Sequence, residues 1–169
     1  MSNTAPITRR ASPTPAFLFS HPAHFIALGF GAGLAPFAPG TFGTLVAIPI
    51  AVLFWTYLPD AAFGITVIAF ALAGIWAAQV TGRNLGVADH AAIVCDEVAA
   101  FLFVLYFVGE DMFLIGVAFF LFRFFDIAKP PPIRQLDSAF KNGFGVMVDD
   151  FAAAGYTLLA LAVWRTLVG

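Results

Sequence analysis

Acidic and basic side chains are rare in this chain, and seven of the 18 gather in three short segments. Only 11% of the residues are charged, whereas 61% are hydrophobic. The segments hold Asp96 and Glu97, then Arg123, Asp126 and Lys129, and finally Asp149 and Asp150. Two cations cannot neutralise five neighbouring carboxylates, but a divalent cation would reduce their mutual repulsion. Oxygen ligands without a histidine or cysteine pair at zinc spacing favour Mg²⁺. The residue types therefore predict a magnesium site, with an anionic substrate held by the cation, Arg123 and Lys129.

An earlier segment, GFGAGLAPFAPGTFGT, has the composition of an anion-binding loop. Glycine lets backbone N–H groups approach an anion, and a helix that starts near Thr41 or Gly43 would direct its positive end toward it. We therefore predict that Gly40, Thr41 and Gly43 bind substrate. The segment matches neither the Walker pattern nor the dinucleotide fingerprint.

Five apolar runs must position these residues. They cover residues 43–58, 61–80, 91–108, 112–125 and 151–168. A membrane-spanning helix needs about 20 apolar residues, and the mean hydropathy of the chain is +0.93. We predict an all-α, polytopic membrane helical bundle with four to five spanning helices. The glycines and prolines between His24 and Gly40 favour a re-entrant or surface-lying segment instead of a crossing. We expect residues 1–20 to form a flexible tail and residues 21–169 to form a single membrane-embedded domain that carries the site.

The connections between the runs predict where the charges meet. Short turns follow the first and third runs, and longer connections follow the second and fourth. Alternating crossings then bring all three charged segments and the glycine-rich segment to one face of the membrane. Every Lys and Arg except Arg165 falls on that side, and cytoplasmic segments are enriched in these residues. The site should therefore face the cytoplasm.

Local spacing adds three expectations. If a helix starts near Asp89, then Asp89 and Asp96 lie two turns apart on one stripe. Arg123 and Asp126 are three residues apart and can touch on a helix surface. Lys129 precedes Pro130, so it should leave the helix in an extended conformation.

Other classes of protein and site are disfavoured. The net charge of −2 provides no broad basic surface for nucleic acid, and the single cysteine, Cys95, excludes an intramolecular disulfide. Asp149 and Asp150 could instead cap a helix, and Arg123 could reach toward the membrane surface. Asp96 and Glu97 interrupt an apolar run, where a carboxylate costs about 2.5–3.5 kcal/mol on insertion scales, so a purely structural role is least expected of them.

Four motifs in order, LAPFAPGTFGTL, IVCDEVAAF, FRFFDIAKPPPIRQLD and GFGVMVDDFAAAGY, resemble the phosphatidylglycerophosphatase A family. That family is bacterial, Mg²⁺-dependent and membrane-associated, and it hydrolyses the terminal phosphomonoester of phosphatidylglycerophosphate to give phosphatidylglycerol. The resemblance covers the chain from about Gly29 to Tyr156, and its motifs are specific in combination. It implies an enzyme of glycerophospholipid biosynthesis in the bacterial cytoplasmic membrane.

The resemblance also implies roles for individual residues. The matching motif positions are Pro39, Gly40, Thr41, Gly43, Asp96, Glu97, Arg123, Asp126, Lys129, Pro130, Gly143, Gly145, Met147, Asp149 and Asp150. The chain departs from the family at Cys95 and at Ala99-Ala100, where a bulkier residue followed by glycine is more usual.

A mechanism follows as a hypothesis. Asp96, Glu97, Asp149 and Asp150 would hold one or two Mg²⁺ ions. Arg123 and Lys129 would grip the phosphate, and Asp126 would orient the attacking water or act as its base. A covalent aspartyl-phosphate is the alternative chemistry. Two alternative functions stay open, a small transporter or channel subunit with an acidic cation site and a structural assembly factor.

Overall fold

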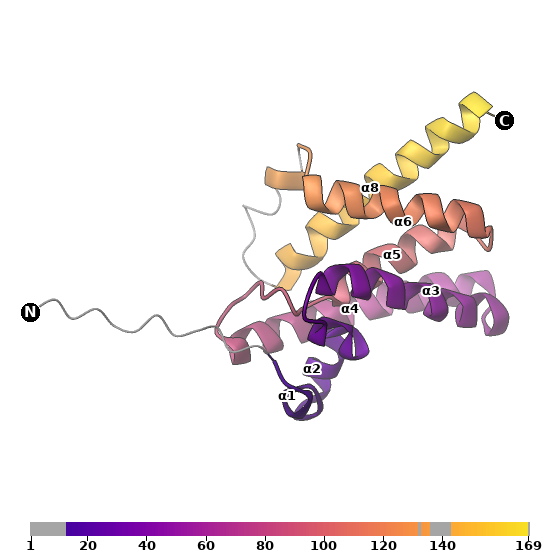
Figure 1. Ribbon diagram of the computed structural model, residues 1–169. Helices are drawn as coiled ribbons and strands as arrows, with labels where there is room; N and C mark the ends of the chain where they lie inside the picture. Colours follow the sequence, from indigo (N-terminus) through magenta and orange to yellow (C-terminus); the bar gives the residue numbers. More distant parts are fainter. Residues whose placement is uncertain (1–12, 132, 136–142, 169) are drawn as a thin grey trace, which may run out of the picture.

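All the regular secondary structure in the described part of the chain is helical. A computed structural model describes residues 13–131, 133–135 and 143–168. Its elements are α1 (Pro15–Phe19), α2 (Pro22–Ala27), the 3₁₀ helix η1 (Gly29–Leu34), α3 (Pro39–Tyr57), α4 (Asp60–Leu85), α5 (Cys95–Val108), α6 (Met112–Ala128) and α8 (Gly143–Val168). Figure 1 shows these helices without any strand between them, which confirms the all-α prediction.

Three described helices are long and apolar enough to cross a membrane. They are α3, α4 and α8, with 19, 26 and 26 residues. The helices α5 and α6, with 14 and 17 residues, are shorter than the roughly 20 residues that a spanning helix needs. The membrane assignment is therefore supported by three helices. The count of four to five spans and the re-entrant segment stay predictions.

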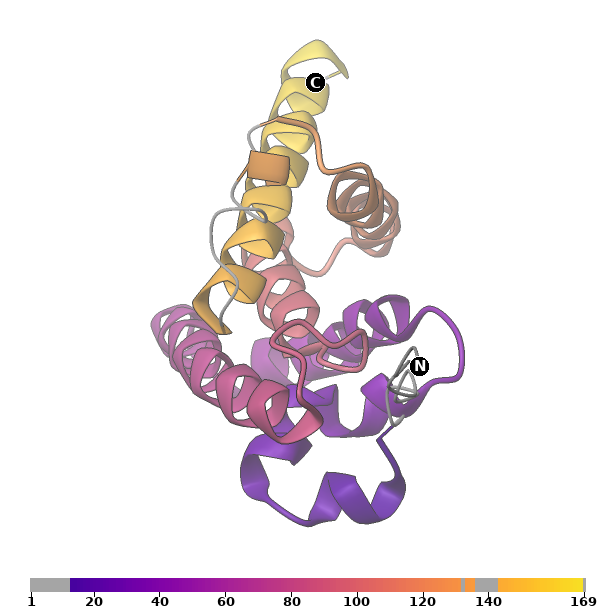
Figure 2. The same ribbon diagram turned by 90° about the vertical axis from the view of Figure 1, so that its left-hand side faces the viewer.

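The short helix α5 forms the centre of the bundle. It packs against α3, α4, α6 and α8, as the two views in Figures 1 and 2 show. Phe101, Leu102 and Leu105 on α5 are fully or almost fully buried, and Phe122 of α6 packs against Phe101. Its Ala99 and Ala100 are completely buried. Small residues let helices approach closely in membranes, so the family difference at these two positions concerns packing.

The helix α5 begins at Cys95, six residues later than expected. Gly86 ends α4 in the left-handed conformation (φ 73°), and residues 87–94 connect the two helices as a loop. The backbone N–H of Val94 donates to the carbonyl of Ala27, at 2.8 Å. This hydrogen bond holds the loop against α2. Because Asp89 lies in that loop and not on α5, the expectation that Asp89 and Asp96 share one helical stripe is wrong.

The helix α8 begins at Gly143, eight residues earlier than the apolar run. A Cβ atom at Gly143 would lie 2.4 Å from the carbonyl oxygen of Ile75 on α4, so only glycine allows this approach. Asp149 and Asp150 therefore lie in the second turn of α8. Because helix caps occupy the ends, the interpretation of these two aspartates as N-caps is wrong.

The N-terminal elements cover one side of the site end. Residues 1–12 of the expected tail, and the basic residues Arg9 and Arg10, lie outside the described residues, as do Asp137 and Lys141. The helix α1 lies within the expected tail. His24 of α2 is buried, and its Nε2 lies 2.8 Å from the Asn84 side chain of α4. This contact links the N-terminal helices to the bundle.

Candidate active site

The predicted convergence of charged segments is a real feature of the fold. The N-terminal ends of α3, α5 and α8 lie at the same end of the bundle as the C-terminal end of α6 (Figure 1). Between them is a pocket of about 250 Å³. Its lining residues are Ala38, Pro39, Gly40, Asp89, Ala91, Ile93, Asp96, Glu97, Arg123, Asp126, Lys129, Val146, Asp149 and Asp150.

Three carboxylates form the deepest part of this pocket. Asp96 and Glu97 lie in the first turn of α5, and Asp150 comes from α8. One oxygen from each of the three lies within 4.8 Å of the others. Asp96 and Asp150 are only 8% and 3% exposed. We call Asp96, Glu97 and Asp150 the acidic trio.

The acidic trio fits a divalent cation. Asp96 Oδ1, Glu97 Oε2 and Asp150 Oδ2 are buried and have no hydrogen-bond partner among the described residues. A buried carboxylate without a partner costs several kcal/mol, and three together repel one another. Hard cations such as Mg²⁺ prefer oxygen ligands of this kind. The donor set therefore matches the predicted chemistry at three of the four expected ligands.

Burial also changes the acidity of the groups at the start of α5, which is not among the candidate spanning helices. Burial, reinforced by the neighbouring charge of Glu97, raises the pKa of the Asp96 carboxyl well above its usual value. The pKa of Glu97 is raised by burial as well. A cation favours the ionised form of its ligands, so it would oppose both shifts. Burial raises the pKa of the Cys95 thiol to about 12, which is consistent with a packing role for this unreactive group.

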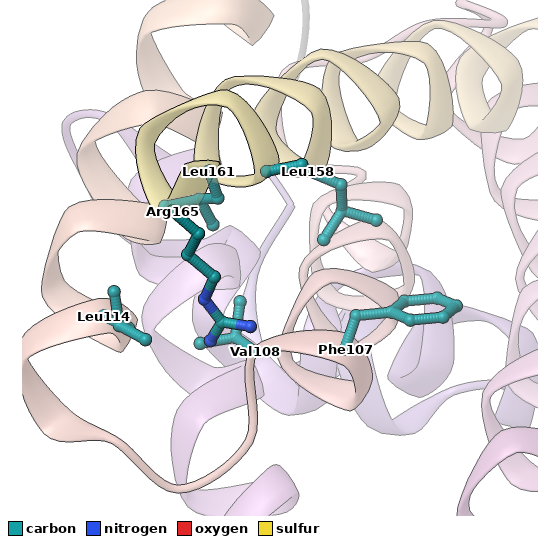
Figure 3. A pocket seen from close by; sticks show the side chains of 7 residues that line it. Phe107, Val108, Leu114, Leu158, Leu161 and Arg165 are labelled. Atoms are coloured by element: carbon teal, nitrogen blue, oxygen red, sulfur yellow. The ribbon is translucent and has the colours of Figure 1, made fainter. Parts of the chain in front are cut away.

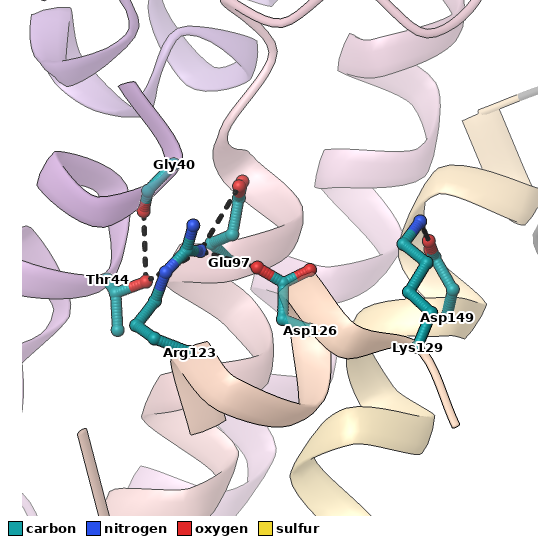
Figure 4. Close-up of polar contacts among 7 residues, drawn as sticks. All are labelled: Gly40, Thr44, Glu97, Arg123, Asp126, Lys129 and Asp149. Atoms are coloured by element: carbon teal, nitrogen blue, oxygen red, sulfur yellow. Dashed lines mark hydrogen bonds and ion pairs between the residues drawn. The ribbon is translucent and has the colours of Figure 1, made fainter. Parts of the chain in front are cut away.

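Arg123 connects the acidic trio to the rest of the pocket. Its Nη1 lies 2.7 Å from Asp126 Oδ2 and 3.6 Å from Glu97 Oε1 (Figure 4). The first distance confirms the contact expected from the three-residue spacing. Nη1 also lies 3.5 Å from the hydroxyl oxygen of Thr44, and that hydroxyl donates to the Gly40 carbonyl at 2.9 Å. Three side chains, one each from α3, α5 and α6, thus hold one guanidinium group.

Lys129 forms a second ion pair in the pocket. Its Nζ lies 2.5 Å from Asp149 Oδ2 (Figure 4). Lys129 leaves the helix, as predicted, but in the left-handed conformation (φ 42°, ψ 61°) instead of the extended one. Asp149 faces this lysine and is not part of the acidic trio. Of the four predicted metal ligands, Asp96, Glu97 and Asp150 therefore lie close to one another, whereas Asp149 forms an ion pair with Lys129.

The glycine-rich segment contributes less to the pocket than expected. A Cβ atom at Gly40 would lie 2.0 Å from Glu97 Oε1, so glycine is required for α3 to approach the acidic trio. Gly43 allows a similar approach to Val94, which is a packing contact. Thr41 is not among the residues that line the pocket. Thr44, one turn later, contacts Arg123 instead.

Two residues in or beside the pocket, Asp89 and Thr44, were not predicted to act. Thr44 is completely buried and carries the polar contact to Arg123. Its position one helical turn after Gly40 was a usable signal, because residues four apart share a helix face. Asp89, expected on a helix with Asp96, is an exposed residue of the loop before α5 that lines the pocket. Its role there depends on the loop before α5, which spacing alone does not define.

Comparisons with known proteins identify the family of this chain. The family model described as phosphatidylglycerophosphatase A matches residues 25–165. The phosphatidylglycerophosphatase A of Haemophilus influenzae is 41% identical over 142 residues, covering 83% of this chain and 87% of the relative. The protein of that name from Escherichia coli is 37% identical over 138 residues, covering 79% and 78%.

A third relative and the solved structures complete the comparison. A Bacteroides thetaiotaomicron protein, provisionally named as a phosphatidylinositol-3-phosphatase, is 39% identical over 151 residues, covering 85% of this chain and 94% of the relative. No solved structure matches the chain. The family model covers the acidic trio, both ion pairs and Gly40. The chain belongs to the phosphatidylglycerophosphatase A family.

Proposed function

We propose that this protein hydrolyses the terminal phosphomonoester of phosphatidylglycerophosphate, giving phosphatidylglycerol and phosphate. The observation that carries the proposal is one pocket that holds the acidic trio, Arg123 with Asp126, and Lys129. Such a pocket joins a cation site to two side chains that bind anions. The substrate assignment is supported by the family and by the names of two relatives.

We propose Mg²⁺ as the cofactor, held by Asp96, Glu97 and Asp150. When bound, Mg²⁺ supplies positive charge that stabilises the negative charge on the transferred phosphoryl group. Asp149 is a further ligand candidate, and it also pairs with Lys129. The unpartnered trio oxygens support this assignment because they have no hydrogen-bond partner among the described residues and a bound cation would compensate their charge.

The chain's own residues would carry out the rest of the reaction. Arg123 and Lys129 bind the phosphate oxygens, because guanidinium and ammonium groups donate charge-assisted hydrogen bonds. Asp126 orients the attacking water and accepts its proton as the oxygen attacks phosphorus. The bond between phosphorus and the glycerol oxygen then breaks, and that oxygen takes a proton to complete phosphatidylglycerol. Gly40 and Thr41 would line the path of the substrate on the α3 side.

An aspartyl-phosphate intermediate is the alternative chemistry within the same site. Acid quench of the enzyme during turnover with substrate labelled in the terminal phosphate would separate the two. Label that stays on the protein would establish the covalent route. The transporter alternative is disfavoured because a cation pathway needs polar groups through the membrane depth, and the buried acids here gather at one end of the bundle.

We also propose how the enzyme sits in the membrane. Residues 21–169 would form a single catalytic domain in the bacterial cytoplasmic membrane. The described basic residues Arg83, Arg123, Lys129 and Arg134 lie at the site end, and Arg165 lies in the last turn of α8. Because Lys and Arg are enriched on the inner side of membranes, this distribution supports an active site at the cytoplasmic face.

The direct test is phosphate release by purified protein in detergent. We expect release from phosphatidylglycerophosphate with Mg²⁺, loss of activity with a chelator, and recovery when Mg²⁺ is returned. Phosphatidate and phosphatidylinositol 3-phosphate are the comparison substrates. Release that persists in chelator would disprove the cation assignment, and faster release from either comparison lipid would disprove the substrate assignment.

A further inference from the structure

The opposite end of the bundle holds a second cavity, which the proposed reaction does not use. It has a volume of about 310 Å³, within the range of about 300–1,000 Å³ typical of small-molecule sites. Phe107 and Val108 of α5, Leu114 of α6, and Leu158 and Leu161 of α8 form its apolar walls (Figure 3). We call this cavity the far-end groove.

One charged side chain enters the far-end groove. Arg165, in the last turn of α8, extends over the groove toward Val108, as Figure 3 shows. It is the one charged residue among the described residues that line this cavity. Within the described part of the chain it has neither an ion pair nor a hydrogen bond. Its five N–H donors are therefore available to a ligand.

The position of Arg165 along α8 places the groove near the other membrane surface. Arg165 follows Asp150 by fifteen residues on one helix, which corresponds to about 22 Å along the axis. The hydrocarbon core is about 30 Å thick. With Asp150 near the inner boundary, Arg165 lies toward the opposite leaflet. Trp164, half exposed beside it, is a residue type enriched at membrane surfaces.

We propose that the far-end groove binds one anionic phospholipid of the opposite leaflet, apart from the catalytic pocket. Arg165 would pair with the lipid phosphate, because a planar guanidinium donates two parallel hydrogen bonds to a phosphate. One acyl chain would lie against Phe107, Leu114 and Leu158. The charge selects an anionic headgroup, and the apolar walls select a lipid over free phosphate.

The alternative role of Arg165 is purely structural. The carbonyl end of α5 is the negative end of its helix dipole, and it attracts a guanidinium without any ligand. The two roles differ in one measurable property. A structural arginine leaves lipid binding unchanged when it is replaced, whereas a lipid-binding arginine does not.

The test is native mass spectrometry of delipidated protein titrated with phosphatidylglycerol, compared with phosphatidylcholine. We expect Arg165→Gln to weaken phosphatidylglycerol binding about tenfold, as loss of a charge-assisted hydrogen bond predicts. Ala162→Phe, which fills the groove from an exposed position, should weaken the binding of both lipids. The matched control is Arg83→Gln, because Arg83 also lies in the last turn of a helix and lines a cavity, but one without large apolar walls.

Phosphate release in detergent shows whether each variant is folded. We expect Arg165→Gln and Ala162→Phe to retain activity within about twofold of the unchanged protein, because neither residue touches the catalytic pocket. Free inorganic phosphate at millimolar concentration should not displace phosphatidylglycerol from the groove. Equal binding of phosphatidylglycerol by Arg165→Gln and the unchanged protein would overturn the proposal, and so would equal loss in Arg83→Gln.

Discussion

The two ends of the helical bundle treat charge in opposite ways. At the site end, five buried or half-buried acids and two bases line one pocket and form ion pairs within it. In the far-end groove, one exposed arginine lies over apolar side chains. The first arrangement suits a cation because Asp96 Oδ1, Glu97 Oε2 and Asp150 Oδ2 have no hydrogen-bond partner among the described residues. The second suits an anion because Arg165 has no ion pair among those residues. The comparison teaches that unpaired charge, more than cavity size, indicates what each end binds.

The largest effect should come from removing one member of the acidic trio. Asp150→Asn keeps the shape of the side chain but removes a ligand charge, and we expect phosphate release to fall about a thousandfold. Kinetic assays at saturating Mg²⁺ would measure the change. The matched control is Asp111→Asn at the far end, where asparagine also caps a helix well and activity should be unchanged. Similar losses in both variants would show that the acidic trio has no special role.

A smaller but still large effect should follow from Gly40→Ala. Its Cβ would overlap Glu97 Oε1, so either α3 or the carboxylate must move, and we expect kcat/KM to fall about a hundredfold. Gly116→Ala is the matched control. Gly116 lies inside α6 with nothing within 4 Å of its added Cβ, so activity should stay unchanged. Normal activity in Gly40→Ala would mean that Glu97 does not need its present position.

Thr44→Val should produce a moderate effect. The change removes the hydroxyl that lies 3.5 Å from Arg123 Nη1, while the shape of the side chain is nearly kept. We expect KM to rise about tenfold, because Arg123, the proposed phosphate ligand, loses a neighbour that positions it. Thr44→Ser should restore most of the loss. If valine and serine behave alike, Thr44 acts through packing alone.

The smallest expected effect on phosphate release is that of Arg165→Gln at the far end. We expect activity within about twofold of the unchanged protein, since the residue contacts none of the catalytic side chains. The same variant should bind phosphatidylglycerol about tenfold more weakly. A large loss of activity in Arg165→Gln would break the comparison, because the two ends would then not be independent.

The sequence predicted where the charged residues meet more accurately than it predicted where the helices that carry them begin. Alternating apolar runs and short turns were enough to bring Asp96, Arg123 and Asp150 to one end, because helix direction depends only on the order of crossings. The starts of α5 and α8 were wrong by several residues. Those boundaries depend on tertiary contacts, such as the hydrogen bond from Val94 to Ala27 and the close approach of Gly143 to Ile75. No local signal records such contacts.

The same limit explains where the predicted and observed arrangements of the site differ. The sequence pointed to Thr41 because the expected helix started near it, and Thr44 was not singled out. In the structure α3 starts at Pro39, and Thr44, whose hydroxyl contacts Arg123, lies about one turn later. Asp149 was grouped with Asp150 because the two are adjacent in sequence. Adjacent residues on a helix point about 100° apart, so one faces Lys129 and the other faces the acidic trio.

The late position of α8 in the chain has a consequence for biosynthesis. Asp96 and Glu97 leave the ribosome about fifty residues before Asp150 does. Until the last helix joins the bundle, the nascent chain holds two acidic groups with no third one to complete the trio. A chain that stops before Gly143 would therefore lack Asp150 and could not complete the acidic trio. We expect such a truncated protein to be inactive as a phosphatase.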